Sequence, residues 1–177
     1  MIQSVKIATI LPYKENYTFQ KAQAAAIWVC DFFKYSKFKN TNFIFGNTKG
    51  NDYLTKNYIN ISINNLKSKF SSSTNEYCKN FIKKTKNDNF DIIEIHNRPL
   101  VFNYLKKEID SKYILYFHND PLSMNGSKTI NERLKLLDEL DKIIFVSKWV
   151  QNRFFEKLDD KLINKTEVVY PSIHKER

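Results

Sequence analysis

Polar side chains able to do acid–base chemistry or to bind ligands follow four short apolar runs of this sequence. The runs are Val5–Leu11, Asp91–Ile95, Lys112–Phe117 and Lys142–Val146. The candidate residues that follow them are, in chain order, Tyr13, Lys14, His96, Asn97, Arg98, His118, Asn119, Asp120, Ser147 and Lys148. In open parallel α/β sheets, ligands bind outside the carboxyl ends of the strands. If the runs are such strands, these residues share one edge of the sheet and form its binding site.

Two of the three histidines, His96 and His118, end apolar runs and are each followed by Asn. An imidazole at such a place can act as a general base, donate a hydrogen bond to a hydroxyl group or bind a metal ion. The alternative is a histidine that only bonds to a neighbouring backbone carbonyl. The sequence contains no His-x-His or Cys-x-x-Cys pattern, so we expect no metal site.

Arg98 and Asp120 each have two interpretations. Arg98 precedes Pro99 at the expected start of a helix, where its guanidinium and nearby backbone N–H groups can hold a phosphate or a carboxylate. Alternatively, Arg98 forms an ion pair with Glu94 or Asp120. Asp120 precedes Pro121, so it can either accept a proton from a hydroxyl group or open an ordinary turn.

The last long helix is expected to begin directly after Ser147, whose hydroxyl group is suited to cap a backbone N–H. A nucleophilic role is not supported, because Ser147 lacks the Gly-x-Ser-x-Gly surroundings of a nucleophile elbow. The aromatic residues Trp149, Phe154 and Phe155 lie at spacings that predict packing in the core.

The chain has 177 residues, of which 42% are apolar, with 14 Phe, 10 Tyr and 2 Trp. This composition predicts one folded domain with a sizeable core. Three glycines are too few for a Gly-rich phosphate loop. Cys30 and Cys78 are isolated thiols that indicate no disulfide framework, and no stretch resembles a signal peptide or a membrane span. We therefore expect a cytoplasmic protein.

The formal net charge is +10, and most of the excess lies between Lys34 and Lys86, where 11 Lys accompany 2 acidic residues. Such a basic region can contact anionic lipids, nucleic acid or a phosphorylated substrate. The alternative is that these lysines only reflect a chain rich in Lys, Asn, Ile, Phe and Tyr throughout. The sequence has no recognisable helix-turn-helix, RNA-binding or zinc motif, so binding to nucleic acid is not expected.

Strand-like and helix-like segments alternate along the chain. Expected strands cover residues 5–11, 43–45, 58–63, 91–96, 112–118, 142–147 and 167–170. Expected helices cover residues 18–35, with Thr18 as the N-cap, then 75–86, 99–109, 129–140 and 148–158, and a Ser-rich loop covers 67–74. Apolar strands that alternate with helices are typical of a parallel sheet covered on both faces. The prediction is a single Rossmann-like, doubly wound α/β domain with about seven mostly parallel strands.

The polar segments, taken in order, resemble a known family. Asp91–Pro99, Tyr116–Pro121, Ile144–Phe154 and Val168–Ile173 are similar to segments in the N-terminal half of family 4 glycosyltransferases, which have the GT-B fold. The resemblance runs through essentially the whole chain. It implies that residues 1–170 form a GT-B N-terminal domain and that residues 171–177 begin the linker to a second domain, which is absent from these 177 residues.

The resemblance implies a retaining hexosyltransferase that needs no metal or other cofactor. Its second domain would bind a nucleotide-sugar donor, and this domain would bind a glycan of a cell-surface polysaccharide or lipopolysaccharide, or a lipid-linked acceptor. The roles that follow are catalysis for His118 and Asp120 and substrate binding for Tyr13, Lys14, His96, Asn97, Arg98, Asn119, Ser147 and Lys148. The basic Lys34–Lys86 region would contact the inner face of an anionic membrane.

Two features depart from the family pattern. The loop Pro12–Thr18 lacks the glycines that let the backbone approach a substrate, and without the donor domain this chain alone is not expected to transfer sugar. Other functions stay open on the same fold. One is a non-catalytic domain that binds glycan or nucleic acid. Another is a hydrolase that uses His118 and Asp120, although no nucleophile accompanies them.

Overall fold

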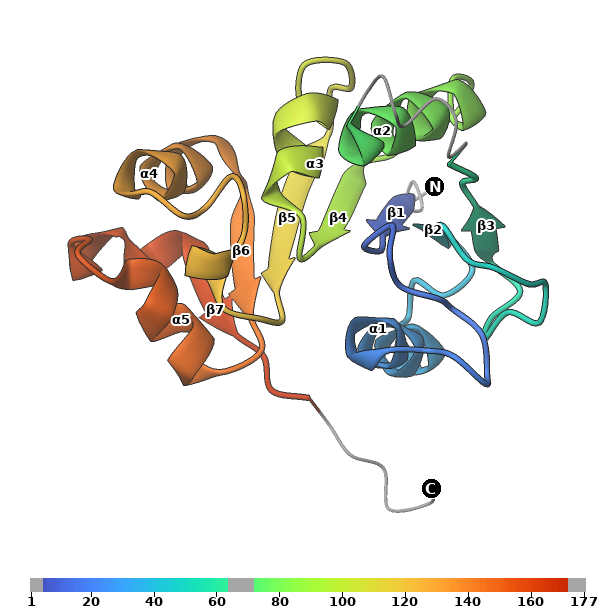
Figure 1. Cartoon of the computed structure of the whole chain (residues 1–177), viewed down its shortest axis with the longest axis horizontal. Coiled ribbons are helices and arrows are strands. Elements are labelled where there is room, and N and C mark those ends of the chain that lie inside the picture. The colour runs from blue at the N-terminus through green and yellow to red at the C-terminus, as the bar shows by residue number, and fades with distance from the viewer. Residues whose placement is uncertain (1–4, 64–71, 172–177) are drawn as a thin grey trace.

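The computed structural model describes residues 5–63 and 72–171, with only the backbone of residues 160–162. The described residues form one α/β domain around a seven-stranded sheet with the strand order β3-β2-β1-β4-β5-β6-β7 (Figure 1). Every pair of neighbouring strands is parallel. The predicted class, a Rossmann-like doubly wound domain with about seven strands, is therefore confirmed.

The strands are short, and helices connect most of them. The strands are β1 (Ile7–Ile10), β2 (Asn42–Gly46), β3 (Tyr58–Asn60), β4 (Ile92–His96), β5 (Lys112–Phe117), β6 (Lys142–Phe145) and β7 (Thr166–Val168). The helices are α1 (Ala24–Tyr35), α2 (Ser73–Lys84), α3 (Pro99–Leu105), α4 (Ile130–Glu139) and α5 (Lys148–Phe155), with 3-10 turns η2 (Pro121–Ser123) and η3 (Asp160–Lys165).

Side chains alternate between two cores, one on each face of the sheet. Along β5, Tyr113, Leu115 and Phe117 belong to the larger core, which is completed by apolar residues of α2, α3, α4 and α5. Tyr116 belongs to the smaller core, which includes Trp28 and other residues of α1. Successive strand residues point to opposite faces, and both faces are buried, so the strands are apolar nearly throughout. Helices cover both faces, as the sequence predicted.

The first strand of the chain is an interior strand of the sheet. Strand β1 pairs with β2 on one side and with β4 on the other, so the chain reverses its direction of travel across the sheet between them. The register places Ile10 opposite Ile95 and Ile95 opposite Leu115, which brings the carboxyl ends of β1, β4 and β5 to the same level. Such a reversal point is where open α/β sheets bind ligands.

The first helix begins later than the sequence indicated. It starts at Ala24, so the prediction that Thr18 is its N-cap is wrong. The carbonyl of Thr18 instead accepts hydrogen bonds from the N–H groups of Lys21 and Ala22, which turns the chain before the helix. The side chain of the actual N-cap, Gln23, makes no capping bond. Glu15 fills this role from the preceding loop, since its Oε2 accepts the N–H of Ala26 at 3.1 Å.

Trp149 also differs from its prediction. Its side chain is 58% exposed, whereas Phe154 and Phe155 are buried as expected. Trp149 lies in the first turn of α5, and Val150, Phe154 and Phe155 carry the packing of this helix. The predicted core role of Trp149 is therefore wrong.

Two other predicted segments lie largely outside the described residues. Of the Ser-rich loop expected at 67–74, the structure describes only the end, where Ser72 caps α2 by accepting the N–H of Asn75 at 3.2 Å. Of the linker expected at 171–177, it describes only Pro171. The division of the chain at this linker stays a prediction.

Helix α4 offers a test of the local sequence signals. Thr129 and Glu132 form a capping box, in which Thr129 Oγ1 accepts the N–H of Glu132 at 3.2 Å and Glu132 Oε2 accepts the N–H of Thr129 at 2.8 Å. We expect Thr129→Ala to lower the free energy of unfolding by about 1 kcal/mol, measured by urea denaturation. Thr129→Ser keeps the hydroxyl group and serves as the control. Equal losses in both variants would contradict a capping role.

Candidate functional site

A pocket of about 450 Å³ opens at the carboxyl ends of β1, β4 and β5, the place that the topology favours. Its lining residues are mostly polar and come from the loops after these strands, from the start of α3 and from the first turn of α2. They are Tyr13, Thr74, Asn97, Arg98, Pro99, Leu100, Asn119, Ser123, Met124, Asn125 and Lys128. We call this cavity the strand-end pocket.

Four of the predicted site residues line the strand-end pocket: Tyr13, Asn97, Arg98 and Asn119. Three others lie elsewhere on the same edge of the sheet. Lys14 is exposed in the loop after β1 and does not line the pocket. Ser147 caps α5, as predicted, by accepting the N–H of Val150 at 3.3 Å. The ammonium group of Lys148 donates to Oε1 of Gln151 at 2.7 Å.

Asn97 joins the ends of β4 and β5. It has a left-handed backbone conformation, with φ of 53°, which Asn tolerates better than most residues. Its backbone N–H donates to the carbonyl of Tyr116 at 2.8 Å, and its side-chain Oδ1 accepts the N–H of His118 at 2.7 Å. Asn97 therefore turns the chain towards Arg98 while it fixes the backbone of His118.

Arg98 is held without an acidic partner at ion-pair distance among the described residues. One guanidinium nitrogen donates to the carbonyl of Asn97 at 2.8 Å, and the guanidinium carbon lies 5.6 Å from the centre of the Tyr13 ring. The two acids considered as partners are used elsewhere: Glu94 accepts hydrogen bonds from Thr9 and Tyr116, and Asp120 pairs with Arg153.

His96 and His118 bond to each other rather than to backbone carbonyls. Nδ1 of His96 lies 2.8 Å from Nε2 of His118, and we call these two side chains the imidazole pair. The His96 ring stacks on Tyr116 at 4.5 Å between ring centres, and Trp28 of α1 lies 5.2 Å from His118. The pair thus lies on the α1 face of the sheet, beside but not within the strand-end pocket.

The imidazole pair is neutral at physiological pH. Burial lowers the pKa of His96 well below its ordinary value, and it lowers the pKa of His118 from 6.5 to about 4. One proton lies between the two rings, so His118 presents Nδ1 as either a donor or an acceptor according to the tautomer. Within the described part of the chain, Nδ1 of His118 has no hydrogen-bond partner and Nε2 of His96 is buried without one.

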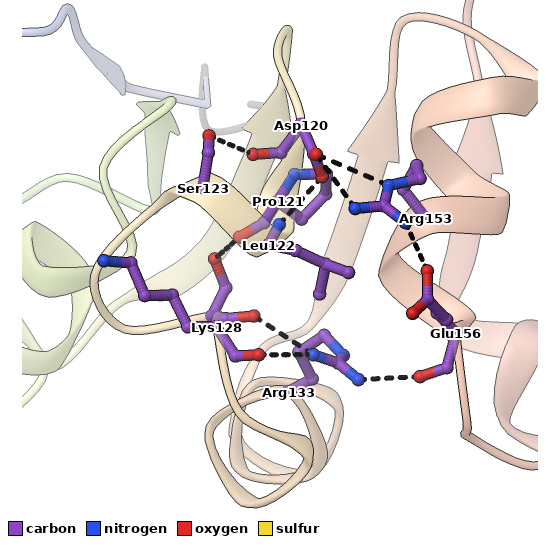
Figure 2. A network of polar contacts seen from close by, with 9 residues as sticks. Asp120, Pro121, Leu122, Ser123, Lys128, Arg133, Arg153 and Glu156 are labelled. Atoms are coloured by element: carbon purple, nitrogen blue, oxygen red, sulfur yellow. Dashed lines mark hydrogen bonds and ion pairs between the residues drawn. The ribbon is translucent and has the colours of Figure 1, made fainter.

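Asp120 uses both carboxylate oxygens within the protein. Oδ1 accepts the N–H of Leu122 at 3.0 Å and so caps η2, while Oδ2 accepts from Arg153 at 3.1 Å (Figure 2). Arg153 also pairs with Glu156. The turn predicted for Asp-Pro is therefore present, and the catalytic role of Asp120 stays a prediction.

A second arginine fixes the loop that forms one wall of the strand-end pocket. Arg133 of α4 is 3% exposed and donates to the carbonyls of Lys128 at 2.9 Å and Glu156 at 2.8 Å (Figure 2). At Gly126, φ is +92° and an added Cβ would lie 3.1 Å from atoms of Pro99 and Leu100, so glycine allows the loop to pack on the start of α3. The loop is thus held from α3, α4 and α5.

Several pocket residues from this loop and from α2 were not predicted from the sequence. Ser123, Asn125 and Lys128 follow β5 on the same loop as Asn119, so their position after a strand was the signal that could have found them. Thr74 reaches the pocket from the first turn of α2. No sequence signal points to Thr74, because its place depends on how α2 packs on the sheet.

Glu15 was also missed, and it changes the character of the loop after β1. Its carboxylate caps α1 through the N–H of Ala26, at the helix end where Rossmann-like folds often bind anions. Burial raises the pKa of Glu15, while the bond to Ala26 and the nearby charge of Arg98 act in the opposite direction. An anionic ligand at the start of α1 would meet this carboxylate.

The lysines of the basic Lys34–Lys86 region do not share one surface. Lys34, Lys37 and Lys39 are exposed at and after the end of α1, whereas the exposed lysines of α2 and the turn after it are Lys79, Lys83, Lys84 and Lys86. Helices α1 and α2 cover opposite faces of the sheet (Figure 1).

No helix within the described ranges is long and apolar enough to cross a membrane. Nor do three His, Cys, Asp or Glu side chains there gather as a metal site would require.

The sequence matches no family model, and a search of curated proteins finds no match. Solved structures with a similar fold include sucrose-phosphate synthase from Thermosynechococcus elongatus, at 9% identity and TM-score 0.59, covering 97% of this chain and 91% of that one. HepE from Anabaena, in complex with UDP, is similar at 11% identity and TM-score 0.57 over 96% of this chain. UDP-N-acetylglucosamine 2-epimerase from Rickettsia bellii is similar at 12% identity and TM-score 0.55 over 93%.

These similarities define the class of fold. The chain has the architecture of one Rossmann-like half of a GT-B structure, in agreement with the prediction from the sequence. It spans 44% of the HepE chain and 44% of the epimerase chain. At such low identity the likeness is one of fold, so activity and substrates must be argued from the site.

The imidazole pair predicts a pH dependence of stability. The pKa of His118 is lower in the folded chain than in the unfolded one, so its contribution is complete above pH 6.5 and is lost as the pH falls towards 4. The free energy of unfolding should decrease as the pH falls over this range, and we expect His118→Gln to make this decrease smaller by up to about 3 kcal/mol. Urea denaturation at a series of pH values measures the free energy of unfolding of the original chain and of His118→Gln. Parallel plots of this free energy against pH would argue against a neutral, buried His118.

Proposed function

We propose that this chain is the acceptor-binding, N-terminal domain of a retaining glycosyltransferase of the family 4 type. The complete enzyme would transfer a hexose from a nucleotide-sugar to a cell-surface glycan or lipid-linked acceptor, in the cytoplasm. A second Rossmann-like domain would bind the donor, so the present chain is inactive alone. HepE, which shares this fold, has been solved with UDP and glucose.

The observation that carries the proposal is the pairing of two sites at one sheet edge. The strand-end pocket offers hydroxyl, amide and cationic groups, and the imidazole pair lies beside it. Asn97 connects them, because it lines the pocket and accepts the N–H of His118. Convergent hydroxyl and amide groups in a cleft suit a sugar, whose many hydroxyl groups each need a donor or an acceptor.

His118 is the residue to which we assign contact with a reacting hydroxyl group. Its neutral ring can accept a hydrogen bond from a hydroxyl group or donate one to it, according to the tautomer. His96 holds the other ring nitrogen of His118, which fixes the orientation of the ring. In this proposal Asp120 acts indirectly, by holding the turn from which the pocket loop extends. A hydrolase is less well supported, since among the described residues no serine or cysteine side chain is hydrogen-bonded to either histidine.

The test is ligand binding by the chain itself, followed through the imidazole resonances of His118. We expect neutral mono- and disaccharides to shift these resonances and UDP to leave them unchanged, because the donor belongs to another domain. His118→Phe should weaken saccharide binding about tenfold, the effect of losing one well-placed hydrogen bond in a desolvated site. Lys135→Gln, on the exposed side of α4, is the control.

Three outcomes would contradict this function. Binding of UDP at His118 would indicate a donor-side domain, and sugar transfer from UDP-glucose by this chain alone would contradict its inactivity. Tight, steeply salt-dependent binding of single-stranded or duplex nucleic acid without saccharide binding would favour a nucleic-acid-binding domain instead.

The proposal includes peripheral contact with an anionic membrane through α2. The exposed Lys79, Lys83 and Lys86 lie along α2 and just after its last turn, whereas Thr74 of the strand-end pocket lies in its first turn. A lysine close to anionic lipid contributes about 1 kcal/mol, and this attraction weakens with salt.

Vesicle sedimentation tests the membrane contact. We expect the chain to bind phosphatidylserine vesicles at low salt, to dissociate at high salt, and to lose most of this binding when Lys79, Lys83 and Lys86 are all changed to Gln. The matched control changes Lys34, Lys37 and Lys39 to Gln, which removes the same charge on the α1 side. Binding that ignores salt, or that falls equally in both triple variants, would refute the contact.

A further inference from the structure

The strand-end pocket has a one-sided charge. Among the described residues, two cations line it, Arg98 and Lys128, and no carboxylate does. Its other polar groups are the amides of Asn97, Asn119 and Asn125 and the hydroxyl groups of Tyr13, Thr74 and Ser123. All of these can donate a hydrogen bond. A cavity with two cations and many neutral donors favours a ligand that carries negative charge.

Arg98 is oriented before any ligand arrives. Its bond to the carbonyl of Asn97 and its position over the ring of Tyr13 restrict the side chain. The planar guanidinium keeps further N–H groups for another partner, and it matches the two oxygens of a phosphate or a carboxylate. A side chain that is already oriented loses less conformational entropy when it binds.

Nearby acids are engaged elsewhere. Glu15 caps α1, Glu94 accepts from Thr9 and Tyr116, and Asp120 pairs with Arg153. Near Lys128, the carboxylate of Glu132 accepts from the backbone and the hydroxyl group of Thr129. Across the described residues, neither Arg98 nor Lys128 has a carboxylate within ion-pair distance.

The wall that carries Lys128 is fixed from behind. Buried Arg133 donates to the carbonyl of Lys128, and Ser127 Oγ donates to the carbonyl of Pro121 at 2.7 Å. Figure 2 shows the Lys128 side chain extending away from this network, so the contacts restrain its backbone and not its ammonium group. Lys128 can therefore add a charge contact at a defined place.

We propose that the strand-end pocket binds an oxyanion group of the acceptor, a phosphate or a carboxylate, through Arg98 and Lys128. This inference rests on the proposed function, and it narrows the acceptor to anionic molecules such as a sugar phosphate or a uronic acid. The capping of α1 by Glu15 supports this placement, because it removes the alternative anion site at that helix end. A volume of about 450 Å³ is in the range of sites for small ligands.

Three probes that share a glucose ring test the inference: glucose, glucuronate and glucose 1-phosphate, titrated at constant ionic strength with detection by NMR. We expect at least one anionic probe to bind about tenfold more tightly than glucose. Arg98→Gln and Lys128→Gln should each remove most of this difference. Arg98→Lys should restore part of it, since charge returns without the planar fork.

Lys112→Gln is the matched control, because it removes one exposed charge at the other end of β5. Stronger binding of glucose 1-phosphate would assign the site to phosphate, and stronger binding of glucuronate to carboxylate. Equal affinity for all three probes would overturn the inference, as would equal losses in Lys112→Gln and Arg98→Gln. Circular dichroism melting of each variant confirms that the fold is kept.

The two proposals fail in different ways. If neutral saccharides still shift the His118 resonances but the anionic probes show no advantage, the anion site is wrong and the acceptor-binding function stands. If anionic probes bind through Arg98 and Lys128 while no saccharide reaches His118, the pocket is an anion site of another function.

Discussion

The hydrogen bond from the backbone N–H of His118 to the side chain of Asn97 is the interaction on which the candidate site depends. At 2.7 Å it ties the end of β5 to the residue that follows β4. Asn97 meets this need with a left-handed backbone, which sends the chain abruptly towards Arg98 and α3. The same residue thus sets the place of the imidazole pair on one face of the sheet and that of the cation on the other.

Burial makes the two halves of the site chemically different. On the α1 face, aromatic rings surround His96 and His118, and removal of water disfavours the charged imidazolium. In the strand-end pocket, Arg98 adds a planar, positively charged guanidinium. One edge of the sheet therefore combines neutral hydrogen-bonding groups with fixed positive charge, although His96 and Arg98 are only two residues apart in the chain.

Local patterns in the sequence were sufficient for the fold and for part of the site. Apolar runs and helical periodicity located all seven strands, and the strand-end rule found Tyr13, Asn97, Arg98 and Asn119. Contacts between distant segments could not be predicted from these local patterns. The bond between His96 and His118 depends on the register that pairs His96 with Tyr116, and the cap that Glu15 gives to α1 spans a loop with no regular repeat. Thr18 was assigned the cap because its side chain is suited to one, but its carbonyl forms a turn first.

The position of Glu15 explains how this domain can lack glycines after β1 and still bind an anion. In many Rossmann-like folds the glycine-rich turn lets a phosphate approach the start of the first helix, where N–H groups and the helix dipole attract it. Here a carboxylate of the chain bonds to that helix end, so the loop needs no close backbone approach and a second negative charge would be repelled. Positive charge is instead supplied one strand away, by Arg98 after β4 and Lys128 after β5. An acceptor held there by its oxyanion would extend its hydroxyl groups along the strand ends towards His118, because Asn97 and Asn119 bridge that short distance.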